Sequence, residues 1–455
     1  MVLRLVRSPY IKPEKKSLAQ LPKVCVQLPI YNEGKVIERL LKSVANLDYP
    51  KDLLEIQILD DSNDSSCEYI DLKSAELMAA GYYVNLIRRE RRDGYKAGAL
   101  RNGLAKTEAD FIAIFDADFA PDADFLKEAI CHFVDEKVGM VQARWGHLNR
   151  KQSLLTRAQA ILIDGHFITE HAARYSTGAF FNFNGTAGVW RKDAIEDAGG
   201  WQGDTLTEDL DLSYRAQLRG WRFVYLRDLV CKAELPEDLP AFKSQQYRWM
   251  KGSAQVFRKL ILSIFNSEIT FRQKIEAFFH LSSNTCYIWM SLVVLLFIPV
   301  SAWRSEQNFK LGTWFELSIF FSTMFSMIVF YVYSQKKQGL KVEILDLFSA
   351  IILCIGMGVH CGLASLDGLF GSTGEFVRTP KHGKQGLVQK DQARVYFSKS
   401  VFKTHLKEFL IASYLLLGVI YMFFVSDLNI MPFGLLLFLG YAFVIHSALT
   451  EKQTI

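Results

Sequence analysis

The sequence predicts an α/β domain built on a mainly parallel sheet, followed by an α-helical transmembrane domain. Over the first half of the 455 residues, short apolar runs alternate with segments whose apolar residues recur at helical spacing. Beyond about residue 265 the chain carries long apolar runs with almost no charge. Half of the residues are hydrophobic, including 34 phenylalanines and 8 tryptophans, which is rich for a soluble protein. Two kinds of domain therefore share one chain.

The first strand, loop and helix are read from "KVCVQLPIYNEG" and "KVIERLLKSVANL", an apolar run broken by Pro and Asn and then a segment with helical spacing. "LEIQILDDSND", "YYVNLIRRE" and "DFIAIFDADFAPDADFL" predict further strands, and "KAGALRNGLAKT" predicts a further helix. In open α/β sheets, ligands bind at the carboxyl ends of the strands. We therefore expect three sets of residues that follow strands to converge on one crevice: Tyr31 to Glu33, Asp60 with Asp61, and Asp116 with Asp118.

The second half contains four windows of roughly membrane-spanning length: His280 to Trp303, Gly312 to Tyr333, Glu408 to Val425 and Pro432 to Leu449. A fifth apolar stretch, Leu345 to Leu366, is interrupted by glycines and a histidine. The loops before and after it are both basic, and basic loops favour the cytoplasmic side. If both loops are cytoplasmic, the stretch crosses zero times or an even number of times. We therefore predict an interfacial or re-entrant segment, with a single full crossing as the alternative.

Charge and cysteine content exclude several classes of function. The net charge of +5 is small, and the positive clusters sit beside the apolar runs, which indicates membrane flanks and not a nucleic-acid surface. The seven cysteines are scattered singly, without the close pairs of zinc or redox motifs, and indicate a reducing compartment. The opening "MVLRLVRSPYIKPEKK" has no apolar stretch of signal-peptide length, so nothing there is expected to export the first domain.

The "DAD" segment gives the first candidate chemistry. Asp116 and Asp118 follow an apolar strand, so their carboxylates leave the sheet together and can hold a hard divalent cation such as Mg2+ or Mn2+. Magnesium takes one or two protein carboxylates and completes its shell with water and substrate phosphates, which suits a nucleotide diphosphate leaving group. A solvated turn is the alternative, because Asp-x-Asp is common in loops.

The segment "LTEDLDLSYRAQLRGWR" gives the second candidate. Thr207 followed by acids is typical of a helix N-terminus. In the sharper interpretation Asp209 is also a general base, which takes a proton from an attacking hydroxyl.

The third candidate is Arg248 with Trp249. The guanidinium fork of Arg248 suits a diphosphate, and the indole face of Trp249 suits a sugar ring. For an isolated Arg-Trp pair beside a span, a membrane aromatic belt would be the favoured interpretation.

Seven segments occur in an order that resembles a known family. They are "LPIYNE", "LDDSND", "YKAGAL", "DAD", "FNFNGTAGVWR", "TEDLDL" and "QQYRW", spread over about 230 residues. The series resembles the processive family-two glycosyltransferases, the group of cellulose, chitin and hyaluronan synthases. "FNFNGTAGVWR" and "QILDDSND" look closest to the cellulose-synthase-like mannan and glucomannan synthases and their bacterial relatives.

The resemblance implies a cytosolic α/β domain of the GT-A type that uses a nucleotide sugar and inverts the anomeric carbon in one displacement. It implies donor-binding roles for Tyr31, Glu33, Asp61, Lys96, Asp116 and Arg248, a metal site at Asp116 and Asp118, a catalytic base at Asp209, and acceptor-binding roles for Asn184, Gly185, Thr186, Gln245 and Trp249. "EFVRTPKHG" is similar to the gating loop of cellulose synthases, with Phe376, Thr379 and Lys381 as its candidate residues.

The expected organisation is a flank at 1–22, a GT-A catalytic domain at 23–240, interfacial helices at 241–275 and a membrane domain at 276–455. The membrane domain has about four spans, the interfacial segment at 345–366 and a gating-type loop at 370–400. Relatives usually carry a span ahead of the catalytic domain, whereas this chain begins with only "MVLRLVRSP" before polar sequence.

The leading hypothesis is an integral membrane glycosyltransferase, in the plasma membrane if bacterial, that elongates a β-linked polysaccharide and passes it through its own helices. The donor is UDP-glucose or GDP-mannose. A single-addition enzyme with a lipid acceptor, of the ceramide or sterol glucosyltransferase kind, is the nearest alternative. A transporter or scaffold that only binds the nucleotide sugar is a third, and it predicts ionisable residues inside the spans, which contain few.

Overall fold

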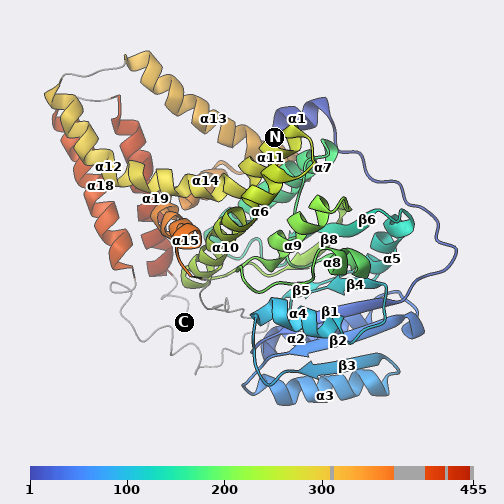
Figure 1. Cartoon of the computed structure of the whole chain (residues 1–455). Coiled ribbons are helices and arrows are strands. Elements are labelled where there is room, and N and C mark those ends of the chain that lie inside the picture. Colours follow the sequence, from blue (N-terminus) through green and yellow to red (C-terminus); the bar gives the residue numbers. More distant parts are fainter. Residues whose placement is uncertain (308–311, 373–404, 426–428, 451–455) are drawn as a thin grey trace.

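The computed structural model describes residues 1–307, 312–372, 405–425 and 429–450. Within them, the first domain is built on an eight-stranded sheet of order β3-β2-β1-β4-β7-β6-β8-β5 (Figure 1). The strands are β1 (Val24–Ile30), β2 (Leu54–Asp60), β3 (Tyr83–Arg88), β4 (Phe111–Ile114), β5 (Phe119–Ala120), β6 (Val138–His147), β7 (Gly188–Arg191) and β8 (Arg222–Ala233).

The two halves of the sheet differ in strand direction. β3, β2, β1 and β4 all run parallel, and they are the four strands that the apolar runs predicted. In the other half β7 runs antiparallel to β4 and β6, and β5 runs antiparallel to β8. The sheet is therefore mixed, because β7 lies between β4 and β6 and runs antiparallel to both. The sequence patterns did not predict β6, β7 or β8.

Helices cover both faces of the sheet, and β1 alternates between the two cores. Val24, Val26 and Leu28 pack on one face against helices α2, α3 and α5, whereas Cys25 points to the other face, where α4, α8 and α9 pack. The helices on the two faces are α2 (Gly34–Ala45), α3 (Ser66–Ala79), α4 (Tyr95–Leu104), α5 (Phe125–Ile130), α8 (Lys192–Asp197) and α9 (Glu208–Leu218). Elsewhere in the chain there are short helices at α1 (Val2–Arg7), η1 (Lys51–Leu53), η2 (Cys131–Val134) and η4 (Ser283–Thr285).

Two long helical segments connect the sheet with the apolar helices. The first comprises α6 (Leu154–Asp164), the π-helical turn η3 (Gly165–His171) and α7 (Ala172–Ser176), and it starts with a capping box between Ser153 and Thr156. The second is α10 (Leu239–Asn266), which begins where the Asp238 carboxylate accepts the backbone N–H of Ala241. α10 carries the "QQYRW" segment as one unbroken helix.

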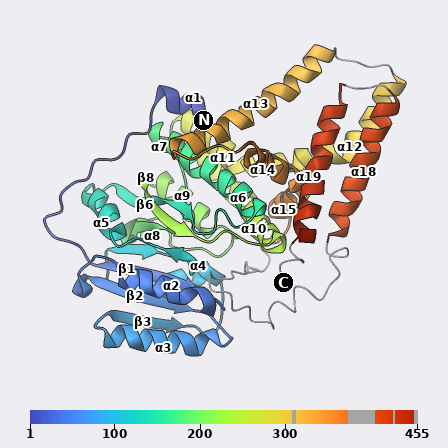
Figure 2. The same ribbon diagram turned by 180° about the vertical axis from the view of Figure 1, so that it is seen from behind.

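Four helical segments among the described residues are long and apolar enough to cross a membrane: Phe271–Glu306, Thr313–Lys337, Leu406–Phe424 and Met431–Leu449. They comprise α11 (Phe271–Ser282) with α12 (Cys286–Glu306), α13 (Thr313–Lys337), α18 (Leu406–Phe424) and α19 (Met431–Thr450). In the view from behind, α12, α18 and α19 stand together on the side of the molecule away from α3 (Figure 2). The chain is therefore consistent with an integral membrane protein.

The fifth predicted stretch forms a bent pair, α14 (Ile344–Gly356) and α15 (Gly358–Phe370), with an angle of 48° at the break. The number of candidate membrane spans among the described residues rises from four to five if this bent pair is one span. Its interfacial placement stays a prediction. The predicted boundary at residue 240 coincides with the start of α10, at Leu239. The gating-loop residues Phe376, Thr379 and Lys381 lie outside the described residues.

Candidate active site

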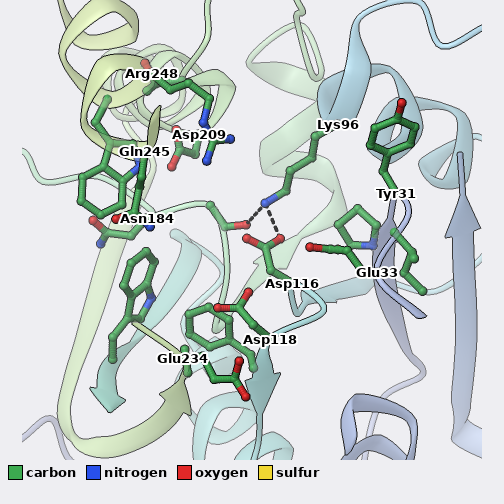
Figure 3. Close-up of a pocket in the computed structure, with 18 of the residues that line it drawn as sticks. Tyr31, Glu33, Lys96, Asp116, Asp118, Asn184, Asp209, Glu234, Gln245 and Arg248 are labelled. Atoms are coloured by element: carbon green, nitrogen blue, oxygen red, sulfur yellow. Dashed lines mark hydrogen bonds and ion pairs between the residues drawn. The ribbon is translucent and has the colours of Figure 1, made fainter. Parts of the chain in front are cut away.

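A pocket opens where the carboxyl ends of β1, β2 and β4 face the first half of α10 (Figure 3). Its lining contains most of the predicted site residues: Tyr31, Glu33, Asp61, Lys96, Asp116, Asp118, Asn184, Gly185, Asp209, Gln245, Arg248 and Trp249. The structure thus brings the strand-end residues to one crevice with α10, although their individual roles stay predictions. Asp60 turns away from the pocket, since its buried carboxylate accepts the Nε–H of Arg88 at 2.7 Å.

Thr186 is a predicted acceptor residue that does not reach the pocket surface. Its side chain is fully buried, and its Oγ1 accepts the backbone N–H of Asp116 at 2.9 Å. Asp116 sits at the end of β4, so this hydrogen bond ties the loop before β7 to the strand end that carries the candidate metal ligand. Thr186 therefore positions Asp116 instead of lining the acceptor site.

The part of the pocket that carries Tyr31 and Asp61, two predicted donor-binding residues, contains a stacked pair and a bidentate ion pair. The Arg92 guanidinium lies 3.3 Å from the centre of the Tyr31 ring, within the range of a cation–π contact. Arg89 donates to both oxygens of Asp61, at 3.0 and 2.5 Å. Asp61 is thereby held at the pocket edge in one orientation. Arg92 was not predicted, because in the sequence it is one member of the charged run "RRERRD".

Lys96 is the cation at the centre of the pocket. Its Nζ donates to Asp116 Oδ1 at 2.5 Å and to the carbonyl oxygen of Gly185 at 2.9 Å (Figure 3). Burial alone would lower the pKa of Lys96, but Asp116 and Glu208 raise it above its ordinary value. Lys96 therefore stays charged where a diphosphate would need a counterion.

Strained backbone conformations concentrate at this site. Among the described residues, the non-glycine residues with positive φ are Asn32, Tyr95 and Ala187, each next to or within two residues of a pocket residue. Gly185 has φ +81°, and a Cβ there would lie 3.1 Å from Asp209 Oδ2 and 3.5 Å from Lys96 Nζ. A larger residue at 185 would therefore be strained and would crowd both functional groups.

Asp209 has the electrostatics that a general base requires. It lies in the first turn of α9, beside Glu208, as the sequence predicted for a helix N-terminus. Burial, and next the negative charge of Glu208, raise the pKa of Asp209 to about 7, and Lys96 opposes the rise. A carboxylate with a pKa near neutrality is matched to proton abstraction at physiological pH.

Helix α10 presents Gln245, Arg248 and Trp249 to the pocket. Burial lowers the pKa of Arg248, and the carboxylates of Glu208, Asp116 and Glu33 counteract this by favouring its charged form. The Trp249 and Trp145 rings lie 6.4 Å apart between centroids, tilted by 52°. Trp145, on β6, also lines the pocket. The sequence did not predict it because β6 itself was not predicted.

Asp116 and Asp118 fit a divalent cation. Both line the pocket, both follow β4, and Asp118 is buried. Among the described residues no group of three or more His, Cys, Asp or Glu side chains is arranged to hold a metal ion. Two carboxylates can suffice for Mg2+, which takes one or two and leaves the other positions for water and phosphate oxygens. The metal site at Asp116 and Asp118 therefore stays a prediction that the chemistry of these residues supports.

The family follows from comparison with known sequences. The family described as "Glycosyltransferase like family 2" matches residues 22–252, which contain the sheet and the pocket residues. The chain belongs to glycosyltransferase family 2. The predicted enzyme class and the predicted family are therefore confirmed.

Curated relatives extend the similarity beyond the family 2 domain. The chain is 36% identical over 409 residues to glucomannan 4-β-mannosyltransferase 1 of Oryza sativa subsp. japonica, covering 87% of this chain and 76% of that protein. It is 35% identical over 412 residues to glucomannan 4-β-mannosyltransferase 2 of Arabidopsis thaliana, covering 84% and 74%.

A solved structure supports the fold. A mannosyltransferase from Pyrobaculum calidifontis, in complex with GDP-Man and Mn2+, matches with a TM-score of 0.54 at 19% identity, over 81% of this chain and 92% of that one. This likeness agrees with a GT-A fold for the family 2 domain. The predicted fold class, a GT-A domain followed by an apolar helical region, is confirmed.

Proposed function

We propose that this family 2 enzyme is a hexosyltransferase that lengthens a β-linked mannan or glucomannan with mannosyl residues from GDP-mannose. The proposal rests mainly on the similarity to glucomannan 4-β-mannosyltransferases. That similarity covers 87% of the chain, so it extends past the family 2 match into the apolar helices. It supports a polysaccharide acceptor over single addition to a lipid, and mannose over glucose. UDP-glucose is the alternative donor.

The acceptor half of the pocket supports a sugar ligand. Three buried polar atoms of pocket residues have no hydrogen-bond partner among the described residues: Trp145 Nε1, Thr207 Oγ1 and Gln245 Oε1. Buried polar atoms are normally paired, since leaving one unpaired costs about 1–3 kcal/mol. A sugar chain carries many hydroxyl groups that both donate and accept, and it can lie along the Trp249 face. We infer that these atoms bind acceptor hydroxyls.

The geometry supports a single displacement. The terminal acceptor hydroxyl attacks the anomeric carbon, and the new C–O bond forms as the bond to the diphosphate breaks, which inverts the configuration at that carbon. Asp209 accepts the hydroxyl proton, and its pKa of about 7 leaves about half of it deprotonated at neutral pH, poised to take up a proton. The nucleoside diphosphate departs toward Lys96 and Arg248, which are fixed in place before the charge develops.

Asp116 and Asp118 would hold a divalent cation, Mg2+ or Mn2+. When bound, the cation supplies positive charge to the diphosphate oxygens. Asp116 already pairs with Lys96, so one carboxylate aligns both positive charges with the leaving group.

We further propose that the catalytic domain faces the cytosol and that the polymer enters the membrane beside α10. The face of α10 opposite the pocket is tied to α15, because the Lys251 ammonium donates to Asp367 at 2.7 Å and the Tyr247 hydroxyl donates to the same carboxylate. One helix therefore links the pocket to the bent pair of apolar helices. This arrangement suits extension of a chain at the point where it leaves the cytosol.

The test is a donor screen with product sizing. Purified protein in detergent or nanodiscs is incubated with radiolabelled GDP-mannose or UDP-glucose, with Mg2+ or Mn2+, and the product is sized before and after β-mannanase digestion. We expect a polymer that forms from GDP-mannose and is degraded by β-mannanase. A lipid-soluble product carrying a single sugar would contradict the proposal and favour the lipid acceptor. The Asp209→Asn variant serves as the inactive control.

A further inference from the structure

A buried polar cluster lies beside the acceptor half of the pocket, and the proposed mechanism leaves it without a role. It is centred on η3, the π-helical turn Gly165–His171, which carries His166, Glu170 and His171. π-helical turns are rare and occur frequently at functional sites, where they re-aim side chains out of the regular helical spacing. Here the turn directs His166 at Asn184, a pocket residue, with 3.0 Å between His166 Nε2 and Asn184 Oδ1.

Contacts with Asn182 and His171 hold the Asn184 amide beside His166. The Asn182 side-chain nitrogen donates to the Phe183 carbonyl at 2.9 Å and to Asn184 Oδ1 at 3.2 Å, while Asn184 Nδ2 donates to the Asn182 carbonyl at 3.4 Å. Asn184 Nδ2 also lies 3.0 Å from His171 Nε2, which lies 3.0 Å from the same carbonyl oxygen. The Asn184 side chain is therefore enclosed by Asn182 and the two histidines.

Both nitrogens of His166 have polar partners. Nδ1 lies 3.1 Å from Glu170 Oε2, and Nε2 faces the Asn184 amide oxygen. Glu170 is a carboxylate, because burial, which raises its pKa, is outweighed by His166 and Arg174, which hold the pKa well below its ordinary value. The ring is therefore held from both sides, by Glu170 at one nitrogen and by Asn184 at the other.

Glu170 and two further histidines surround the His166 ring. Glu170 also accepts Arg174 Nε–H at 3.1 Å and lies 4.0 Å from His280 Nε2, on α11. The ring of His171 lies 4.4 Å from that of His166 between centroids. Burial, followed by the charge of His166, lowers the pKa of His171 well below its ordinary value, so this neighbour is neutral. His166 itself keeps partial solvent access, with 30% of its side chain exposed.

We propose that His166, held in turn by Glu170, fixes the side-chain amide of Asn184, and that this lock sets how the acceptor sugar is held. His166 is thus a positioning residue for acceptor binding, with Glu170 as the partner of its other nitrogen. The inference rests on the proposed function insofar as Asn184 contacts the acceptor. Figure 3 shows Asn184 beside Gln245 and across the pocket from Tyr31, so loss of the lock should disturb the acceptor and leave the donor in place.

The test separates transfer to the polymer from hydrolysis of the donor by water, which needs no acceptor. In His166→Ala we expect transfer to fall about tenfold, the worth of a hydrogen bond, with shorter products. Donor KM and donor hydrolysis should stay within about twofold of the wild type. Asn184→Ala should show the same pattern, and the double variant should be no worse than either single variant, because both remove one coupled unit.

A second variant guards against simple damage to the fold. In His166→Gly, added imidazole should restore transfer, because a free ring can occupy the space between Glu170 and Asn184 and contact both. Thr177→Ala is the matched control. The Thr177 hydroxyl donates to the Ala173 carbonyl at 2.7 Å just beyond the same helical segment, and its loss should leave transfer unchanged.

The outcomes are distinct for the two proposals. If transfer and hydrolysis fall together in His166→Ala, or if imidazole restores nothing, or if transfer is unchanged, the positioning role is overturned. All rates are compared with the wild type on whichever donor it accepts. A wild-type protein that uses UDP-glucose alone would therefore overturn the GDP-mannose assignment while the His166 comparison remains decisive.

Discussion

The donor side and the acceptor side of the pocket are constructed in different ways. On the donor side, Tyr31 and Asp61 follow directly after β1 and β2, and Asp116 follows β4 with only Phe115 between, all in the parallel half of the sheet. On the acceptor side, Asn184, Trp145 and Trp249 come from a loop before β7, from β6 and from α10. The donor side is thus formed by residues at the ends of neighbouring strands. The acceptor side is formed only when segments that are distant in the sequence pack together. Changes to either side should consequently affect different kinetic quantities.

The largest expected effect is at Asp209, where the two sides meet. Asp209→Asn removes the base but preserves side-chain shape, so mannosyl transfer should fall about 1000-fold. GDP-mannose binding, measured by calorimetry, should be retained because Lys96 and Arg248 remain. Asp204→Asn is the matched control, since Asp204 is an exposed carboxylate in the same segment that pairs with Lys259. Undiminished transfer by Asp209→Asn would remove Asp209 as the base.

Cation removal should affect the donor side almost as strongly. Chelation by EDTA should lower transfer on the order of 100-fold, because the diphosphate then departs without the metal charge. Added Mn2+ or Mg2+ should restore it. Asp118→Asn should weaken the restoration by raising the metal concentration required, whereas Asp122→Asn, an exposed aspartate in the same loop, should not. A metal titration that is identical in Asp118→Asn and wild type would contradict the assignment.

The pH profile tests the environment of Asp209. Because burial raises the pKa of Asp209 to about 7, the group is protonated below that pH and cannot accept a proton. The kcat should rise with pH and level off above about 7, losing roughly tenfold for each unit below it. Stopped assays at saturating donor from pH 5 to 9 measure this. A kcat that is flat between pH 5 and 7 would place the base elsewhere.

Trp249 tests whether the acceptor side can be changed without affecting the donor. Trp249→Ala removes the ring on which we place the acceptor sugar, and transfer should fall about tenfold, with shorter products and an unchanged donor KM. Trp249→Phe keeps an aromatic face and should recover most of the loss. If donor KM rises in step with the loss of transfer, Trp249 belongs to the donor side and the division between the sides is wrong.

The smallest expected effect is at Thr186. Thr186→Val leaves the buried N–H of Asp116 without its acceptor, which costs about 1–3 kcal/mol of folding stability and loosens a metal ligand. We expect a lower apparent Tm and a few-fold lower kcat, while Thr186→Ser restores both. A normal metal titration together with a reduced acceptor affinity would contradict this positioning role and return Thr186 to the acceptor site.

The donor side could be predicted from the sequence because a residue that follows a parallel strand has a known place, at the carboxyl edge of the sheet. An apolar run that stops at Asp116 indicates where its carboxylate will lie relative to Tyr31 and Asp61, since the carboxyl ends of parallel strands meet at one edge. The sequence placed Thr186 incorrectly, because a neighbour of Asn184 in sequence can point into the core while Asn184 points into the pocket. It did not indicate Trp145, because the β6 run carries charged and polar residues that hide its strand pattern.

By itself the sequence determined the alternation of strands and helices, the apolar helices and the ordered motifs, because each depends on local spacing of side chains. Only the tertiary structure decided that His166 meets Asn184, that Arg92 stacks on Tyr31, and that burial beside Glu208 tunes Asp209. Hydrogen bonding and desolvation depend on which groups exclude water around a side chain, and those groups come from segments far apart in the chain.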